Sequence, residues 1–128
     1  MHWTVEPPGA DEYAIVTTSG TFSVADHLRM IDDIVGSAWW RPGTDVLFDH
    51  RGFNFGEADL RAMYEASSNH LRNDDRIGSG KAAILVRSLS DFGRGRQFEQ
   101  LTEGRVSATM HIFLNEAEAR GWLAGQTV

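Results

Sequence analysis

The chain has no cysteine, only three prolines and no long hydrophobic run among its 128 residues. The lack of cysteine excludes disulfides, thiolate metal sites and cysteine nucleophiles. The longest apolar runs, such as residues 82–86, are about five residues long, whereas a membrane-spanning helix needs about 20. The first residues, Met1 to Thr4, lack the basic and then apolar pattern of a signal peptide. We therefore expect a cytoplasmic protein without a membrane span.

Acidic residues outnumber basic ones, with 18 Asp and Glu against 12 Lys and Arg, which gives a net charge of −6. This balance disfavours nucleic-acid binding, which needs a positive face. The hydrophobic share of 41% is enough for a packed core and argues against a disordered chain. The length fits one domain, and no repeat or linker divides the chain. We therefore expect a single domain over residues 1–128.

Strand patterns alternate with helix patterns along the chain, which is typical of an α/β fold with a mainly parallel sheet. The short turn at residues 7–9 adds an antiparallel hairpin at the N-terminus. We expect a mixed, mostly parallel five-stranded sheet and about four helices, with polar loops at residues 73–76 and 78–80. The expected strands are residues 3–5, 13–18, 46–48, 82–86 and 108–114, and the expected helices are residues 24–35, about 57–70, about 92–101 and 116–123.

Capping residues mark the ends of several helices. Ser23 and Asn115 each precede an acidic residue by three positions, as in a capping box, and Gly36 ends the first helix. Ser90 is interpreted as the cap of the third helix. The apolar face expected for the first helix consists of Val24, Leu28, Ile31 and Val35.

Polar residues follow two of the expected parallel strands. Loop 49–52 follows the strand at 46–48, and loop 87–91 follows the strand at 82–86. Ligands of open α/β sheets bind beyond the carboxyl ends of such strands, so the two loops form one candidate site if the strands are neighbours. The candidate ligand-binding residues in these loops are Asp49, His50, Arg51, Arg87, Ser88 and Ser90.

The helix after the second loop begins with residues that disfavour a helix start. Gly93 and Gly95 each cost about 1 kcal/mol relative to alanine, and Arg94 and Arg96 oppose the helix dipole. One interpretation is an anion site, in which Gly93, Arg94 and Arg96 bind phosphate or carboxylate. The other is structural: Gly95 lets the helix lie close to the sheet, and the arginines pair with Asp91, Glu99 or Asp49.

Three phenylalanines, Phe53, Phe55 and Phe92, lie next to the same loops in the sequence. They either pack in the core, cover an apolar pocket, or form a patch that faces a partner.

Metal or acid–base chemistry at these loops has little support. Asp49 and His50 point to opposite faces if the strand continues through them, and no two histidines have the spacing of a metal-binding pair. We therefore expect no metal, no cofactor and no catalytic residue. An enzyme using Asp49, His50 or Ser88 is the least favoured alternative. Asp49 is otherwise a carboxylate that accepts backbone N–H bonds, His50 a surface or packing residue, and His111 a core histidine.

Several stretches resemble one known family. Residues 45–53 are similar to its central strand and loop, residues 81–86 and 92–99 to its next strand and helix, and residues 112–119 with 122–123 to its closing strand and helix. These runs resemble the SpoIIAA-like proteins, a branch of the STAS-type domains related in fold to anti-sigma-factor antagonists. The resemblance covers nearly the whole chain and implies a STAS-like α/β fold.

The better-known relatives are non-enzymatic, bacterial-type regulators that bind partner proteins. Some are switched by phosphorylation of a serine before the helix that follows the central strand. The matching stretch here, residues 52–59, contains no Ser or Thr, so this switch does not carry over. A distant relationship to lipid carriers of the Sec14 type implies a small apolar or acyl ligand as an alternative.

We therefore predict a non-catalytic regulatory or binding module. It recognises a partner protein or a small anionic ligand at the carboxyl ends of the parallel strands, and a homodimer is left open. The alternative is a carrier of a small lipid or apolar metabolite. Both hypotheses require loops 49–52 and 87–91 to be neighbours.

Overall fold

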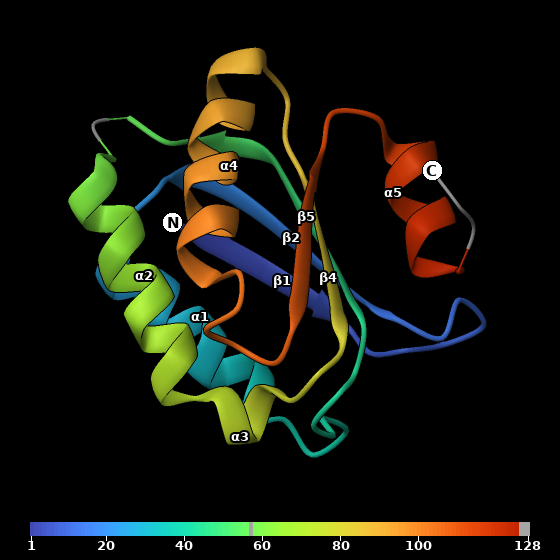
Figure 1. The fold of residues 1–128 in the computed structure, drawn as a ribbon. Coiled ribbons are helices and arrows are strands. Elements are labelled where there is room, and N and C mark those ends of the chain that lie inside the picture. Colours follow the sequence, from blue (N-terminus) through green and yellow to red (C-terminus); the bar gives the residue numbers. More distant parts are fainter. Residues whose placement is uncertain (57, 126–128) are drawn as a thin grey trace.

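The sheet has the mixed topology that the sequence predicts. A computed structural model of the chain describes residues 1–56 and 58–125, and within them five strands form one sheet in the order β1-β2-β3-β4-β5. β1 pairs antiparallel with β2, and the other neighbours pair parallel (Figure 1). The strands are β1 (His2–Glu6), β2 (Ala14–Thr21), β3 (Val46–Asn54), β4 (Lys81–Leu85) and β5 (Thr109–Phe113).

Helices cover both faces of the sheet. α1, α2 and α4 lie on one face and α5 lies on the other (Figure 1). The expected order of strands and helices is confirmed with one addition, because part of the expected polar loop forms the short helix α3. Asp74 and Asp75 in its first turn suit the positive end of a helix. The helices in the described part of the chain are α1 (Val24–Val35), α2 (Leu60–Arg72), α3 (Asp74–Ile77), α4 (Leu89–Thr102) and α5 (Glu116–Leu123).

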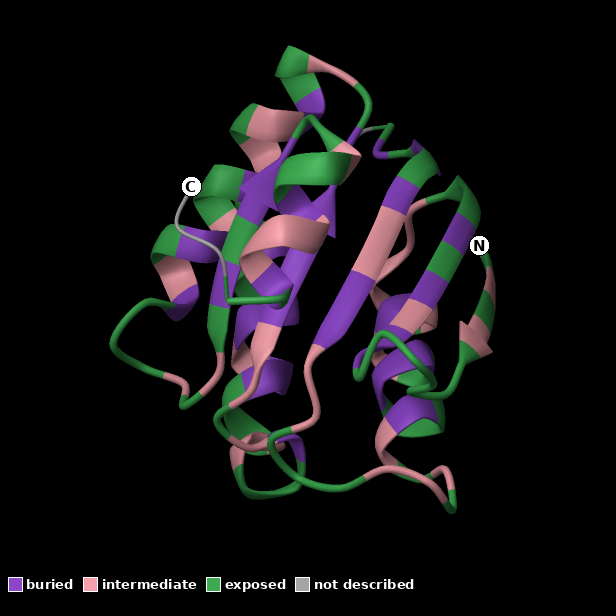
Figure 2. Cartoon of the chain, turned by 90° about the vertical axis from the view of Figure 1, so that its right-hand side faces the viewer, coloured by how far each residue is buried: buried purple, intermediate pink, exposed green. Residues whose placement is uncertain are grey.

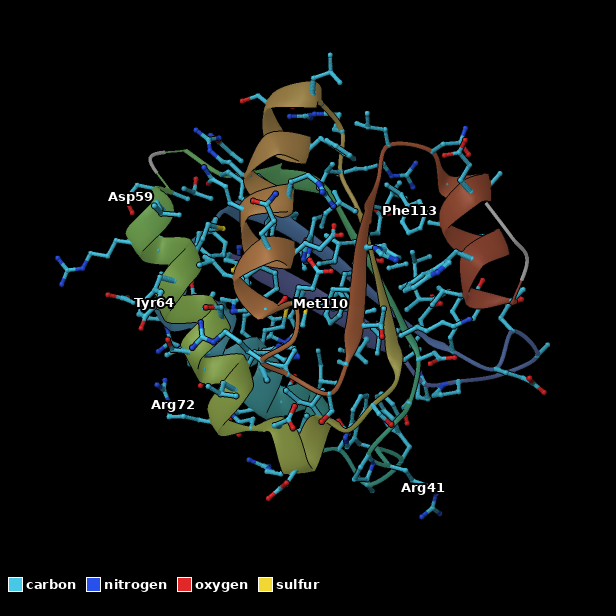
Figure 3. All side chains as sticks on the ribbon, in the orientation of Figure 1. Arg41, Asp59, Tyr64, Arg72, Met110 and Phe113 are labelled. Atoms are coloured by element: carbon cyan, nitrogen blue, oxygen red, sulfur yellow. The ribbon has the colours of Figure 1, made fainter. Side chains whose placement is uncertain are left out.

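The core has one layer on each side of the sheet. Leu47, Leu85 and Phe113 pack toward α5, whereas Met110 lies on the other face of β5, where the Thr102 hydroxyl of α4 contacts its sulfur (Figure 3). Buried segments follow the strands and the sides of the helices that face them (Figure 2). Alternate residues of each strand therefore belong to different layers.

Two of the three expected serine and asparagine caps are confirmed. Ser23 and Asn115 cap α1 and α5, each accepting a backbone N–H three residues on. Ser90 was the wrong cap for α4: the Ser88 Oγ accepts the Asp91 N–H at 3.1 Å, and Ser90 lies in the first turn. The helix begins at Leu89 rather than at about residue 92, because Ser88 has the extended backbone of an N-cap.

The second helix, by contrast, begins later than expected. The expected start, Glu57, lies outside the described residues. Asp59 caps α2, and its side chain accepts the backbone N–H of Ala62 at 2.9 Å.

The largest difference from the expected elements is the length of β3. The expected strand ended at Phe48, but β3 runs on to Asn54, so residues 49–52 are not a loop. After a bulge, the continuation pairs with the end of β2. A Cβ on Gly52 would lie 2.6 Å from the carbonyl oxygen of Thr18, so this glycine permits a close approach of two strands. The prediction that β3 and β4 are neighbours is confirmed, with Asp49 opposite Leu85.

Gly95 sets the distance between α4 and the sheet. A Cβ at this position would lie 3.0 Å from side-chain carbons of Ile112 on β5, whereas a Cβ on Gly93 would meet nothing within 4 Å. The structural interpretation of Gly95, that it lets the helix lie close to the sheet, is confirmed.

Substitution by alanine is therefore expected to change the stability in opposite directions at the two glycines. Gly93→Ala is expected to raise the free energy of unfolding by about 0.5–1 kcal/mol, because alanine favours the helix and meets no neighbour. Gly95→Ala is expected to lower it by about 1 kcal/mol, because Ile112 must move and this strain outweighs the helix preference. Urea unfolding of both variants and the wild type measures the difference. Equal stabilisation by both substitutions would contradict the close contact with Ile112.

Candidate functional site

His50 points into the layer between the sheet and α1, α2 and α4, where it is 7% exposed. Its Nδ1 lies 2.7 Å from the hydroxyl oxygen of Thr18, and that hydroxyl donates to the carbonyl oxygen of Asp49 at 3.2 Å. With the hydroxyl hydrogen on the carbonyl, the hydroxyl oxygen accepts from Nδ1–H, which leaves the lone pair on Nε2. The ring also stacks on Phe53, with 4.5 Å between centroids. His50 is therefore a packed and oriented side chain, in line with its structural interpretation.

A small cavity lies beside His50, at the carboxyl ends of β3 and β4. Its volume is about 50 Å³, and apart from two histidines its walls are apolar. We call it the His27–His50 cavity. The sheet side of its wall consists of Phe22, which follows β2, of His50 and Phe53 on β3 with Phe55 just after it, and of Ile84 on β4 with Val86 just after it. The helices contribute His27 from α1, Met63 and Ala66 from α2, and Gly95 and Phe98 from α4.

Two of the three candidate phenylalanines line this cavity. Phe53 and Phe55 are buried in its wall, with ring centroids 5.6 Å apart. Phe92 packs against the same apolar cluster but does not line the cavity. An apolar pocket near the predicted position is therefore present.

Two further histidines are buried in the same layer without hydrogen-bond partners. The Nδ1 of His27 and the Nε2 of His70 have none within the described residues. His27 lines the His27–His50 cavity, whereas His70 lines a second cavity of about 30 Å³ nearer the amino ends of β3 and β4. Both rings lie 6.3 Å from the ring of Phe98. An unpaired imidazole nitrogen in apolar surroundings lowers stability, so each demands a physical reason.

Burial keeps all three imidazoles neutral at pH 7. Loss of hydration lowers the pKa of His50 to about 3, with the charge of His27 as a smaller cause. Loss of hydration also lowers the pKa of His27 and of His70 to about 4. The layer therefore offers hydrogen-bonding nitrogens without a positive charge.

Asp49 and Arg51 lie on the opposite face of the sheet from His50. The Arg51 guanidinium donates to both carboxylate oxygens of Asp49, at 3.0 and 2.8 Å, and to Glu116 of α5 at 2.8 Å. These hydrogen bonds hold the pKa of Asp49 below its usual range. Asp49 also accepts the backbone N–H of Arg51 at 3.1 Å, as its structural interpretation predicts. The candidate residues of the expected first loop are thus divided between two faces, because the strand does not end before them.

The arginines at the start of α4 have partners within the chain. Arg96 forms an ion pair with Glu99 at 2.6 Å, and Arg94 lies 4.0 Å from Asp91 and donates to the carbonyl oxygen of Gly56 at 3.3 Å. The expected pairing with acidic neighbours is confirmed, with Asp91 and Glu99 as the partners. Binding of a ligand by Gly93, Arg94 and Arg96 stays a prediction, as does binding by Arg87, Ser88 and Ser90.

His111 was wrongly interpreted as a core histidine. Its side chain is 49% exposed on β5, where its Nδ1 lies 3.1 Å from Glu99 and its ring packs on Trp122. The alternation of β5 places residue 111 on the face opposite Met110, where α5 only partly covers it.

His27 is the main residue of the cavity wall that the sequence pattern did not predict. The expected apolar face of α1 was rotated from the true one, whose buried residues are His27, Met30, Ile31 and Ile34. The spacing of His27 from Met30 and Ile31 carried the signal, since residues three and four apart share a helix face.

Neither a metal centre nor a membrane span is found in residues 1–56 and 58–125. No group of three or more His, Asp and Glu there has the arrangement to hold a metal ion. No described helix is both long and apolar enough to cross a bilayer.

Comparison with known proteins gives the fold. No family model matches the chain, and no curated protein matches it. Among solved structures, the chain is similar to an uncharacterized protein of the DUF3478 family with a SpoIIAA-like fold from Shewanella loihica PV-4. The TM-score is 0.60 and the identity 14%, over 95% of this chain and 92% of the other. The expected SpoIIAA-like fold is confirmed, and at this identity the similarity concerns the fold alone.

Because three histidines are buried as neutral rings, the protein is expected to lose stability in mild acid. Unfolded histidines take up protons near pH 6.5 and the folded ones only near pH 3 to 4, so the free energy of unfolding falls as pH drops from 6.5 toward 4. His27→Leu should reduce this loss by about 1–3 kcal/mol, as measured by urea unfolding at several pH values. The carboxylates are the same in the wild type and the variant, so their contribution to the pH dependence cancels when the two proteins are compared. Identical pH dependence of the two proteins would contradict the burial of His27 as a neutral ring.

Proposed function

From the SpoIIAA-like fold as the premise, we propose that this chain is a non-catalytic binding module for a small, mainly apolar molecule. The ligand occupies the His27–His50 cavity, at the carboxyl ends of β3 and β4. Open α/β sheets bind ligands at this end of their strands, and small-molecule sites combine apolar walls with a few polar groups. This favours the carrier hypothesis over recognition of an anion at the two strand-end segments.

The observation that carries the proposal is that His27 lines an apolar cavity while its Nδ1 has no partner among residues 1–56 and 58–125. A buried polar atom without a partner lowers stability by about 1–3 kcal/mol. Active and binding sites are where natural proteins keep such costs, because the ligand supplies the missing contact. His50, by contrast, already has its hydrogen bond to Thr18 and is fixed in orientation.

The anion hypothesis has less support. Arg51 and Arg96 are held by short ion pairs with Asp49, Glu116 and Glu99. An incoming phosphate or carboxylate must displace these internal carboxylates. An enzyme has less support still, since Asp49 and His50 lie on opposite faces and the Ser88 hydroxyl oxygen caps α4.

The cavity volume limits the size of the buried group. About 15 Å³ is needed for one water, and a cavity of about 150 Å³ holds benzene, so about 50 Å³ suits a group of a few heavy atoms. Phe22 and Phe55 form one wall, stacked at 5.9 Å, and Phe22 is only partly buried. A larger ligand therefore buries one short end and contacts these rings with the rest.

Native mass spectrometry of freshly purified protein tests the proposal. The wild type is expected to carry a small molecule that dissociates on unfolding and is identified after extraction. Ala66→Leu fills the cavity and is expected to remove this adduct. The matched control is Ala62→Leu, one turn earlier on α2 and outside the cavity wall, which should retain it. Bare protein in all three samples, or an adduct that Ala66→Leu retains, would count against the proposal.

A further inference from the structure

The polar content of the His27–His50 cavity restricts the chemistry of its ligand. Within its walls, as far as the structure describes them, the polar side chains are the two imidazoles of His27 and His50; no lysine, arginine, aspartate or glutamate contributes. His50 is fixed by the hydrogen bond of its Nδ1 to Thr18, whereas the buried Nδ1 of His27 has no partner within the described residues.

We propose that the ligand is an uncharged molecule with a short apolar body and a hydroxyl group, and that the hydroxyl hydrogen-bonds to the Nδ1 of His27. This inference rests on the proposed function, because it names the ligand class of the same cavity. A hydroxyl both donates and accepts, so it satisfies Nδ1 in either tautomer of the neutral ring.

An anion of the same size does not fit this cavity. A carboxylate or phosphate there loses its hydration, and no cationic side chain in the described wall compensates for that loss. Protonation of His27 offers no easy remedy, because it requires two charges to be buried together in apolar surroundings. The low pKa of His27, about 4, agrees with a site that holds the ring neutral.

The neighbouring cavity provides an internal comparison. His70 is also buried, and its Nε2 has no partner in the described part of the chain, but it lines the cavity formed with Ile31, Val46 and Phe48. His27 and His70 thus have similar surroundings and differ in the cavity they face. Replacing each by leucine separates a specific contact of His27 from a general effect of removing a buried imidazole.

NMR titration with three probes tests the inference at neutral pH: xenon as an apolar probe, propanol as a neutral alcohol, and propionate as its anionic counterpart. Xenon and propanol are expected to shift the methyl signals of Met63, Ile84 and Val86 in a saturable way. Propionate at the same concentrations should leave these signals unchanged. Propionate shifts as large as those of propanol would overturn the inference and leave the proposed function standing.

Three variants assign the effect to His27. His27→Leu should weaken propanol binding about five- to tenfold, which corresponds to one hydrogen bond, and keep the xenon shifts. His27→Gln retains a donor and an acceptor and should restore part of the propanol affinity, and His70→Leu should bind propanol as the wild type does. Equal propanol affinity in His27→Leu and the wild type, or equal weakening by both leucine variants, would overturn the inference. The absence of xenon and propanol shifts in the wild type would overturn the proposed function itself.

Discussion

The pairing of β3 with the end of β2 determines where the candidate residues of β3 lie. Past the bulge, these two strands remain paired through Asn54, and the Thr18 hydroxyl fixes His50 at the point where the register shifts. Because the strand continues, His50 and Phe53 enter the helix-covered layer while Asp49 and Arg51 turn toward α5. A strand that ended at Phe48 would have put all of them on one polar loop.

The layer between the sheet and α1, α2 and α4 is well packed but contains polar groups that lower its stability. Phe53, Val86 and Ile84 supply buried apolar area, but His27 and His70 add polar nitrogens that the described protein does not satisfy. Leucine at these positions would fill similar space without an orphaned nitrogen. Sites that depart from the best packing are where function is found in natural proteins. The same layer keeps the histidines neutral, so the predicted loss of stability in mild acid and the proposed ligand class have one common cause.

The order of the elements could be predicted from the sequence, because helix spacing and short apolar strands are local signals. The length of β3 could not, since Asp49, Arg51 and Gly52 look like loop residues and only the partner strand makes them a strand. Gly52 illustrates the ambiguity: its role is a close approach to Thr18 and not a turn. Of the residues that line the cavity, Phe53 and Phe55 were among the candidates from the sequence, while His27 was missed because the apolar face of α1 was assigned about one residue off.

All of these placements require that His50 lie inside the protein as a neutral ring bonded to Thr18 through Nδ1. Nitrogen-15 NMR of the histidine rings in the folded protein tests it directly. The His50 signals are expected to keep the values of a neutral ring with hydrogen on Nδ1 from pH 7 down to about pH 5, because burial lowers its pKa to about 3. A change to the doubly protonated form with a midpoint near pH 6.5 would contradict the burial of His50, because it indicates a ring in contact with water and not one packed beside Thr18.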